Sequence, residues 1–180
     1  TSRLLGLEAR ARLLGVHGPM LERSDIPDSA RERLSALLRG EPAGQAPLAG
    51  SGLRAGSVRG RLVGGNLRTV AASLGTPWEI DTRGAILFLE EVGEQPYSLD
   101  RSLVQLRESG KLAAAAGIAV GALVDCESER YPETTSRAAV CEILMAAVGG
   151  PIALDLPFGH IADHRALGFG VLAELDGARG

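Results

Sequence analysis

Three glutamates follow a short apolar run, Ala85 to Leu89, which has the pattern of a strand covered on both faces. Glu90 and Glu91 come first, and Glu94 follows shortly after them. Because α/β proteins place their sites at the carboxyl ends of strands, a carboxylate here could take part in catalysis. Neighbouring side chains on a strand point to opposite faces, so only one of Glu90 and Glu91 is expected to be buried, and Glu94 is expected at the surface. Solvated loop charges are the alternative interpretation.

A histidine follows a second predicted strand, at 151–156. His160 comes after a turn, and His164 lies four residues later beside Asp163. A carboxylate that orients a histidine fixes its tautomer and supports the imidazolium, which makes the histidine a suitable proton shuttle near pH 7. Zinc held by His160 and His164 is the alternative, but the residues after His164 have no helical pattern and the cysteines are not spaced to help. A histidine–carboxylate pair is the more economical hypothesis.

A Gly-Gly-Asn turn, Gly64 to Asn66, joins another predicted strand to a helix. The glycines permit a close approach of backbone or ligand, and Asn66 is predicted to be the helix N-cap. A helix N-terminus behind Gly65 and Asn66 could bind an anion, and a plain strand-to-helix turn is the alternative.

The serine that would complete a hydrolase triad is not found among the residues. There is no Gly-x-Ser-x-Gly elbow in the sequence. Ser24 precedes a proline-bearing approach to a helix, and Ser73 and Ser102 lie within predicted helices. The residues by themselves therefore predict an incomplete site.

Composition excludes several classes of function. The 19 basic and 22 acidic side chains give a net charge of -3, which argues against a nucleic-acid-binding domain. The longest apolar run, 112–124, is shorter than the roughly 20 residues that a membrane-spanning helix needs. We therefore expect a cytoplasmic protein with reduced Cys126 and Cys141, no nucleic-acid or membrane partner, no metal and no cofactor.

The elements that would position these groups alternate between strands and helices, which favours an α/β fold. Residues 1–39 are predicted to be helical, residues 40–56 have the composition of a linker, and 57–180 form a second unit. Ser29 is the predicted N-cap of a helix that ends at Arg39. The other predicted elements are helices at 4–14, 66–74, 98–110 and 135–148, and strands at 58–63, 85–89, 117–124, 151–156 and 171–175.

Several segments, taken in order, resemble the serine LD-carboxypeptidase family, which includes muramoyl-tetrapeptide carboxypeptidases and microcin C self-immunity peptidases. Each segment is short, but the ordered set is specific, and the resemblance covers nearly all of the chain from His17-Gly18-Pro19 onward. The segments are Gly64–Leu67, Leu74–Pro77, Ile86–Tyr97, Asp100–Leu106 and Phe158–His160.

The resemblance implies a Ser–Glu–His triad at a cleft between two domains. An N-terminal α/β domain would supply the serine and the oxyanion hole, and a C-terminal domain of swivelling β/β/α type would supply the other two residues. Glu90 and His160 match the triad glutamate and histidine, while Glu91 replaces a commoner aspartate. Gly65 and Asn66 are candidates for binding the substrate carboxylate.

The resemblance also implies that the nucleophile lies outside this chain. Counting back from His17 places the family's elbow serine just upstream of Thr1, so Ser2 is not the nucleophile. We therefore expect the C-terminal part of an LD-carboxypeptidase, in which residues 1–39 are the remnant of the nucleophile domain. Such a chain is expected to have no peptidase activity alone.

The activity implied for the complete enzyme is release of the terminal D-alanine from a murein tetrapeptide during peptidoglycan recycling. The alternatives are a self-immunity peptidase that cleaves a peptide-nucleotide toxin and a non-catalytic interaction module derived from the same domain. Expected partners are a murein-derived peptide, the missing N-terminal domain and a second copy of the chain, since the face left uncovered would favour association.

Overall fold

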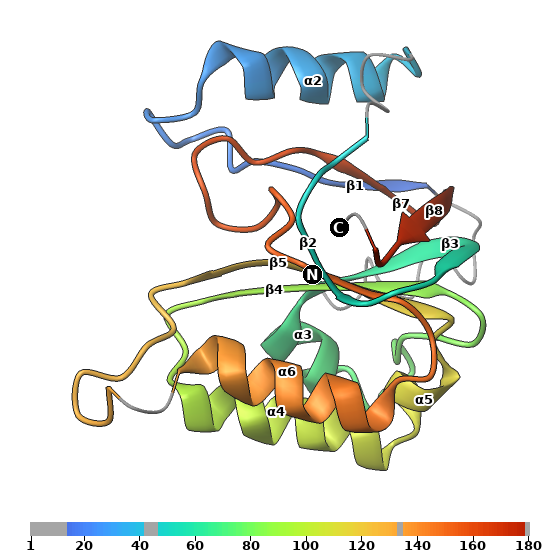
Figure 1. The fold of residues 1–180 in the computed structure, drawn as a ribbon. Helices are drawn as coiled ribbons and strands as arrows, with labels where there is room; N and C mark the ends of the chain where they lie inside the picture. Colours follow the sequence, from blue (N-terminus) through green and yellow to red (C-terminus); the bar gives the residue numbers. More distant parts are fainter. Residues whose placement is uncertain (1–13, 42–46, 133–134, 179–180) are drawn as a thin grey trace.

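The computed structural model describes residues 14–41, 47–132 and 135–178, which form a mixed α/β fold (Figure 1). Its centre is a six-stranded sheet in the order β2-β6-β5-β4-β3-β8. The four inner strands run parallel, and the two edge strands, β2 and β8, are antiparallel to their neighbours. The strands are β2 (Ser51–Arg54), β3 (Ser57–Asn66), β4 (Ile86–Val92), β5 (Gly117–Val124), β6 (Ile152–Leu154) and β8 (Leu172–Asp176).

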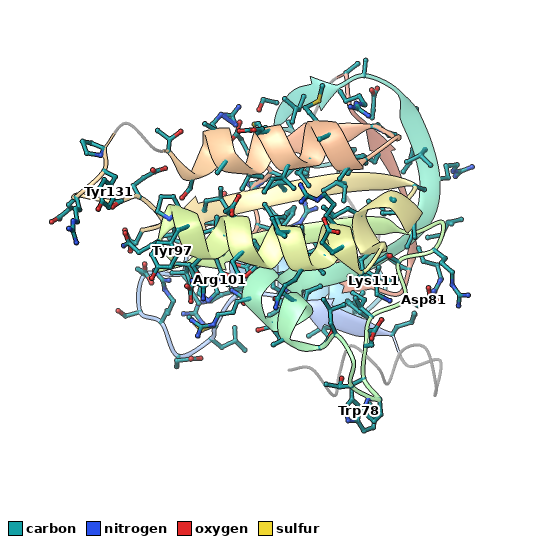
Figure 2. All side chains as sticks on the ribbon, turned by 90° about the horizontal axis from the view of Figure 1, so that it is seen from below. Trp78, Asp81, Tyr97, Arg101, Lys111 and Tyr131 are labelled. Carbon is teal, nitrogen blue, oxygen red and sulfur yellow. The ribbon has the colours of Figure 1, made fainter. Side chains whose placement is uncertain are left out.

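Four helices cover one face of the sheet (Figure 1). Seen from that side, α4 and α6 lie side by side (Figure 2). The apolar stripe predicted on α4, formed by Leu99, Leu103 and Leu106, is buried against the sheet. The helices are α3 (Leu67–Ala72), α4 (Pro96–Glu108), α5 (Lys111–Ala114) and α6 (Ser136–Ala147).

The other face is covered by helix α2 (Asp28–Leu38) and by a small antiparallel pair of strands, β1 (Gly15–His17) and β7 (Leu167–Phe169) (Figure 1). Phe88 of β4 is fully buried under this layer, with its ring edge-on to the ring of Phe158 at 5.7 Å between centroids. Since both faces are covered, the inner strands are continuous apolar runs, as the sequence predicted.

The predicted strands and the three helices after residue 57 are all present, with ends shifted by a few residues. The N-cap predicted at Asn66 is confirmed, because its Oδ1 accepts a hydrogen bond from Thr69 N at 3.0 Å. The N-cap predicted at Ser29 is wrong. Helix α2 begins at Asp28, and the extended Pro27 before it accepts the first helical hydrogen bond from Ala30 N.

Strand β2 lies inside the residues that composition assigned to a linker, 40–56. It pairs with β6, with Ser51 opposite Leu154, so this part of the range belongs to the sheet. Glycine and serine made it resemble a loop, although an edge strand can tolerate them. The division into 1–39, 40–56 and 57–180 otherwise stays a prediction, and the helix expected at 4–14 falls almost entirely outside the described residues.

None of the helices within the described ranges is both long enough and apolar enough to cross a membrane.

Candidate active site

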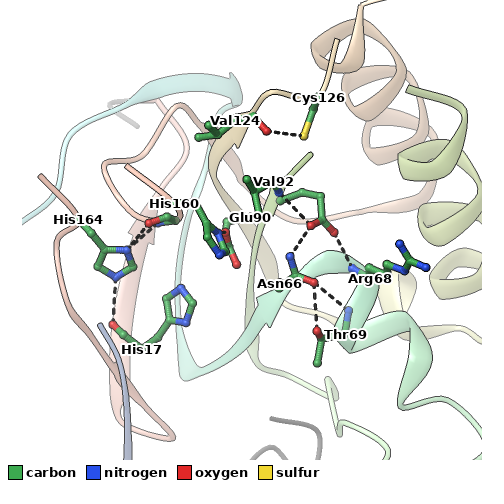
Figure 3. Close-up of polar contacts among 12 residues, drawn as sticks. His17, Asn66, Arg68, Thr69, Glu90, Val92, Val124, Cys126, His160 and His164 are labelled. Carbon is green, nitrogen blue, oxygen red and sulfur yellow. Dashed lines mark hydrogen bonds and ion pairs between the residues drawn. The ribbon is translucent and has the colours of Figure 1, made fainter. Parts of the chain in front are cut away.

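Glu90 and His160 meet at the carboxyl end of β4. Glu90 stands near the end of the strand, and His160 lies on the loop that follows β6. Nδ1 of His160 donates to Oε2 of Glu90 at 2.8 Å, because an ionised carboxylate can only accept (Figure 3). Glu90 is fully buried, whereas 29% of the His160 side chain is exposed. This arrangement leaves Nε2 of the imidazole free to take a proton.

Gly159 allows the two segments to approach this closely. Its φ is +116°, a conformation that side-chain-bearing residues rarely adopt. A Cβ at this position would lie 3.1 Å from both Cβ and Oε2 of Glu90. The positive φ and this tight contact together favour glycine before His160.

Burial raises the pKa of the Glu90 carboxyl above its ordinary value, and the hydrogen bond from His160 acts in the opposite direction. Within the described ranges, Oε1 of Glu90 has no hydrogen-bond partner. His160 is therefore the principal group that stabilises the ionised form of this buried carboxylate. The same attraction would stabilise an imidazolium at His160.

A hollow of about 110 Å³ opens beside His160. Its other wall is the turn after β1, with His17, Met20 and Arg23 among the lining residues. Arg23 is held in place by Asp25, and its Nη1 donates to the His160 carbonyl at 3.3 Å. Of the described residues that line this hollow, none is serine, threonine or cysteine. The described part of this hollow thus presents a proton acceptor but no hydroxyl or thiol nucleophile.

Glu91 faces the opposite side of the sheet and is also buried, with 2% of the residue exposed. Its carboxylate accepts hydrogen bonds from Asn66 Nδ2, from Arg68 N at 2.9 Å and from Val92 N at 2.9 Å (Figure 3). The expectation that only one of the two adjacent glutamates is buried is therefore wrong, because the start of α3 covers the second face.

Glu94 is the most exposed of the three glutamates, as predicted, although it is half-buried. It forms an ion pair with Arg68 and accepts a hydrogen bond from Ser98 Oγ at 2.6 Å. These two partners hold the pKa of the Glu94 carboxyl below its ordinary value. The interpretation of all three glutamates as solvated loop charges is excluded for Glu90 and Glu91.

Gly65 and Asn66 lie beside the Glu90–His160 pair, because Asn66 is the register partner of Glu90 on the adjacent strand. The Asn66 side chain is already bonded to Glu91 and to Thr69. The main chain at Gly65 is more open, since a Cβ there would meet nothing within 4 Å. The structure thus brings both residues to the site, and their role in substrate binding stays a prediction.

His164 lines the same hollow as His160, but its ring nitrogens are engaged elsewhere. It is 2% exposed, and both of its ring nitrogens face main-chain groups of Gly159 and His17. Throughout the described ranges, no group of three or more His, Cys, Asp or Glu side chains is placed to hold a metal ion. The contacts of these two rings therefore give the zinc alternative no support.

His17 also lies at this site, although the sequence predicted only a turn there. Its ring lies 5.0 Å from the His164 ring and 5.3 Å from the Phe88 ring, between centroids. The pKa of His17 is lowered from 6.5 to about 4, chiefly by burial, with charge repulsion from His164 and His160 acting in the same direction. The His-Gly-Pro triplet was the available signal, but nothing local to it points toward His160.

Comparison with known proteins relates this geometry to one family. Residues 59–175 match the family model described as the LD-carboxypeptidase C-terminal domain. The chain is 43% identical over 176 residues to a Synechocystis sp. protein provisionally named a carboxypeptidase. It is 34% identical over 189 residues to the murein tetrapeptide carboxypeptidase of Pseudomonas aeruginosa.

Solved structures agree in fold. The muramoyltetrapeptide carboxypeptidase of Oxalobacter formigenes superposes with a TM-score of 0.81 at 27% identity, over 97% of this chain and 61% of that one. The microcin C7 self-immunity protein superposes with a TM-score of 0.80 at 20% identity, over 98% of this chain and 62% of that one, which shows the fold alone.

The chain spans only part of its relatives. The matches cover 95% of it but 56% of the Synechocystis protein, and 99% of it but 61% of the Pseudomonas enzyme.

Proposed function

The chain belongs to the LD-carboxypeptidase family, and from that premise we propose that it forms the part of a serine LD-carboxypeptidase that carries the general base and its carboxylate partner. The observation that supports this most is the 2.8 Å hydrogen bond from His160 Nδ1 to the buried Glu90, which leaves Nε2 free beside a hollow. In this proposal the sheet and its helices are the swivelling β/β/α domain, and the residues before them belong to the nucleophile domain.

The proposed reaction is acyl transfer through a serine that lies outside this chain. The serine oxygen attacks the carbonyl carbon of the bond to the terminal D-alanine while His160 Nε2 takes its proton. The tetrahedral intermediate then collapses, and His160 returns the proton to the departing amine. Water hydrolyses the acyl-enzyme by the same route, with its proton passing to His160. Glu90 keeps the imidazole in the Nδ1–H tautomer and stabilises the imidazolium.

The proposed substrate is a murein tetrapeptide. Support comes from the 34% identity to the murein tetrapeptide carboxypeptidase of P. aeruginosa and from the 27% identity to the O. formigenes muramoyltetrapeptide carboxypeptidase. The substrate carboxylate would bind at the open main chain of Gly65 and beside Asn66. Arg68 N and Thr69 N, two donors of the first turn of α3, are already bonded to Glu91 and Asn66.

A chimaera tests the proposal. The 180 residues would be joined to the N-terminal part of the P. aeruginosa enzyme that they do not span, and D-alanine release from murein tetrapeptide would be measured. We expect release by the chimaera, none by the chain alone, and a loss of roughly 10⁶-fold in kcat for the chimaera carrying His160→Ala.

The matched control in the chimaera is Glu94→Gln, which changes the glutamate just beyond the end of β4 without touching the His160–Glu90 pair. It should retain near-full activity. D-alanine release by the 180-residue chain alone would contradict an external nucleophile. A folded chimaera that is inactive, or one that is indifferent to His160→Ala, would contradict the assignment of His160 as the base.

A further inference from the structure

His164 is a buried imidazole that the proposed reaction does not use. Only 2% of the residue is exposed, and it lies on the same loop as His160. A buried polar side chain is costly unless its hydrogen-bonding groups are satisfied, so its partners indicate what it does. Those partners are main-chain groups on two segments that are far apart in the sequence.

The first segment is the loop of His160 itself. Nδ1 of His164 lies 2.9 Å from Gly159 N and 2.5 Å from Gly159 O. Gly159 is the residue whose positive φ and close contact with Glu90 favour glycine. Nδ1 can accept from Gly159 N when it is unprotonated or donate to Gly159 O when it is protonated. In either state the side chain holds a peptide group next to His160, and so it restricts the direction in which His160 leaves the loop.

The second segment is β1. Nε2 of His164 lies 3.3 Å from the carbonyl oxygen of His17, the residue that starts the opposite wall of the hollow. The ring of His164 thus spans the space between the two walls (Figure 3). The β1–β7 ladder, in which His17 is opposite Leu167, joins the same two parts of the chain further from the site.

The ring can hold both segments in either of its protonation states. As the neutral Nε2–H tautomer, it donates to the His17 carbonyl and accepts from Gly159 N. As the cation, it still donates to His17 and can donate from Nδ1 to the Gly159 carbonyl. The other neutral tautomer would set a lone pair on Nε2 against the His17 carbonyl and would lose that bond.

We propose that His164 is a positioning residue that joins Gly159 to His17 and thereby holds His160 against Glu90. The importance of this for catalysis rests on the proposed role of His160 as the base. The positioning of His160 by His164 does not depend on that role, because its hydrogen bonds can be observed without substrate.

The test is NMR of the ¹⁵N-labelled chain, which contains only three histidines. Long-range proton–nitrogen spectra at pH 7 report the tautomer of each ring, with His164→Asn and His160→Gln used for assignment. We expect His164 as the Nε2–H form or the cation, and His160 with its proton on Nδ1. A neutral His164 with its proton on Nδ1 would overturn the proposal.

Two substitutions then separate positioning from simple packing. His164→Phe keeps a ring but removes both hydrogen bonds, so the His160 Nδ1–H signal should shift and hydrogen exchange at Gly159 N should accelerate by about tenfold. His164→Asn places an acceptor close to the position of Nδ1, so it should restore most of the protection at Gly159 N. A folded His164→Phe with unchanged His160 and Gly159 signals would overturn the proposal.

Ser73→Ala is the matched control for lost stability. Ser73 is fully buried, and its Oγ donates to Val70 O at 2.7 Å at the end of α3. This variant should lose stability without moving the His160 signal. If His164→Phe does not fold, the proposal is tested by the tautomer of His164 in the wild-type chain and by the hydrogen-exchange rate of Gly159 N in His164→Asn. Failure of the chimaera to release D-alanine would leave all of these signals unaffected, so the two proposals fail separately.

Discussion

Glu90 and Glu91 are neighbours on β4 that point to opposite faces of the sheet, and their surroundings differ. Glu91 is bonded to three donors from its own strand end and from the start of α3. Glu90 has one partner, the His160 ring, and a second oxygen without a partner in the described part of the chain. The two carboxylates are thus both buried, but Glu91 has more hydrogen-bond partners than Glu90. The Glu91 face has its hydrogen bonds satisfied locally, and the Glu90 face keeps a carboxylate under-satisfied beside the partly exposed imidazole of His160.

The sharpest way to break this comparison is to neutralise each glutamate in the chimaera described above. Glu90→Gln should reduce kcat by about 10³-fold or more, because an amide can no longer balance charge on the imidazolium. Glu91→Gln should reduce it by no more than about tenfold, since its carboxylate does not contact His160. D-alanine release under saturating substrate measures both. Equal losses would mean that the two faces are not functionally distinct.

The order should reverse for folding stability. Glu91→Gln should lower the free energy of unfolding by about 2–3 kcal/mol, because one oxygen that accepts from buried donors becomes a competing amide donor. Glu90→Gln should change it by less than about 1 kcal/mol, since removing a buried, poorly satisfied charge offsets the altered bond to His160. Urea denaturation at pH 7 gives both values. A larger loss for Glu90→Gln would refute the comparison.

The folding stability of the Glu90 face should also decrease in acid, because His17 lies on this face. The folded-state pKa of His17 is about 4, below its ordinary value of 6.5, so on acidification the unfolded chain takes up this proton before the folded chain does. His17 therefore contributes stability that is present above pH 6.5 and is lost between pH 6.5 and about 4, by up to roughly 3 kcal/mol.

His17→Gln should flatten this part of the stability profile, measured by urea denaturation between pH 7 and pH 4.5. Glu90 acts in the opposite direction. Its pKa is raised, so its contribution to stability is fully present below the ordinary glutamate pKa and is lost as the pH rises through the raised value. Making both measurements in a Glu90→Gln background isolates the histidine. An unchanged slope in His17→Gln would show that another group carries the acid response.

The smallest effect is expected at Glu94, which belongs to neither buried environment. Its ion-pair partner Arg68 has a side chain that is 70% exposed, so the pair is largely screened by solvent. Glu94→Gln should therefore change the free energy of unfolding by about 0.5 kcal/mol or less. A loss as large as that of Glu91→Gln would mean that this end of β4 depends on its surface charges.

The sequence predicted the parts of the fold whose signals are local. Strand β5 (Gly117–Val124) is an apolar run, and the sequence predicted both of its ends to the residue. Asn66 was predicted as an N-cap because an asparagine directly before a helical pattern is a local signal. Strand β2 was missed because its pairing with β6 depends on a distant partner. The glycine and serine in this segment give no local strand signal, and the strand is defined by its pairing in the folded sheet.

The site was less accessible to such reasoning. Residue types and strand ends indicated Glu90 and His160 separately and favoured a histidine–carboxylate pair, but only the family resemblance identified Glu90 as the partner of His160. The burial of Glu91 depends on where α3 begins relative to β4, which periodicity does not specify. The contacts of His17 and His164 join segments at opposite ends of the described chain, and no local pattern encodes them.

The pairing of β1 with β7 has a consequence for the order in which the molecule folds. Gly15 is opposite Phe169, so this ladder closes a loop that contains almost all of the described residues. Pairs such as β4 with β5 close much shorter loops and form sooner. The sheet can therefore assemble while the hollow beside His160 is still open. During synthesis, the wall that carries His17 must wait for β7 to leave the ribosome before His160 acquires its surroundings.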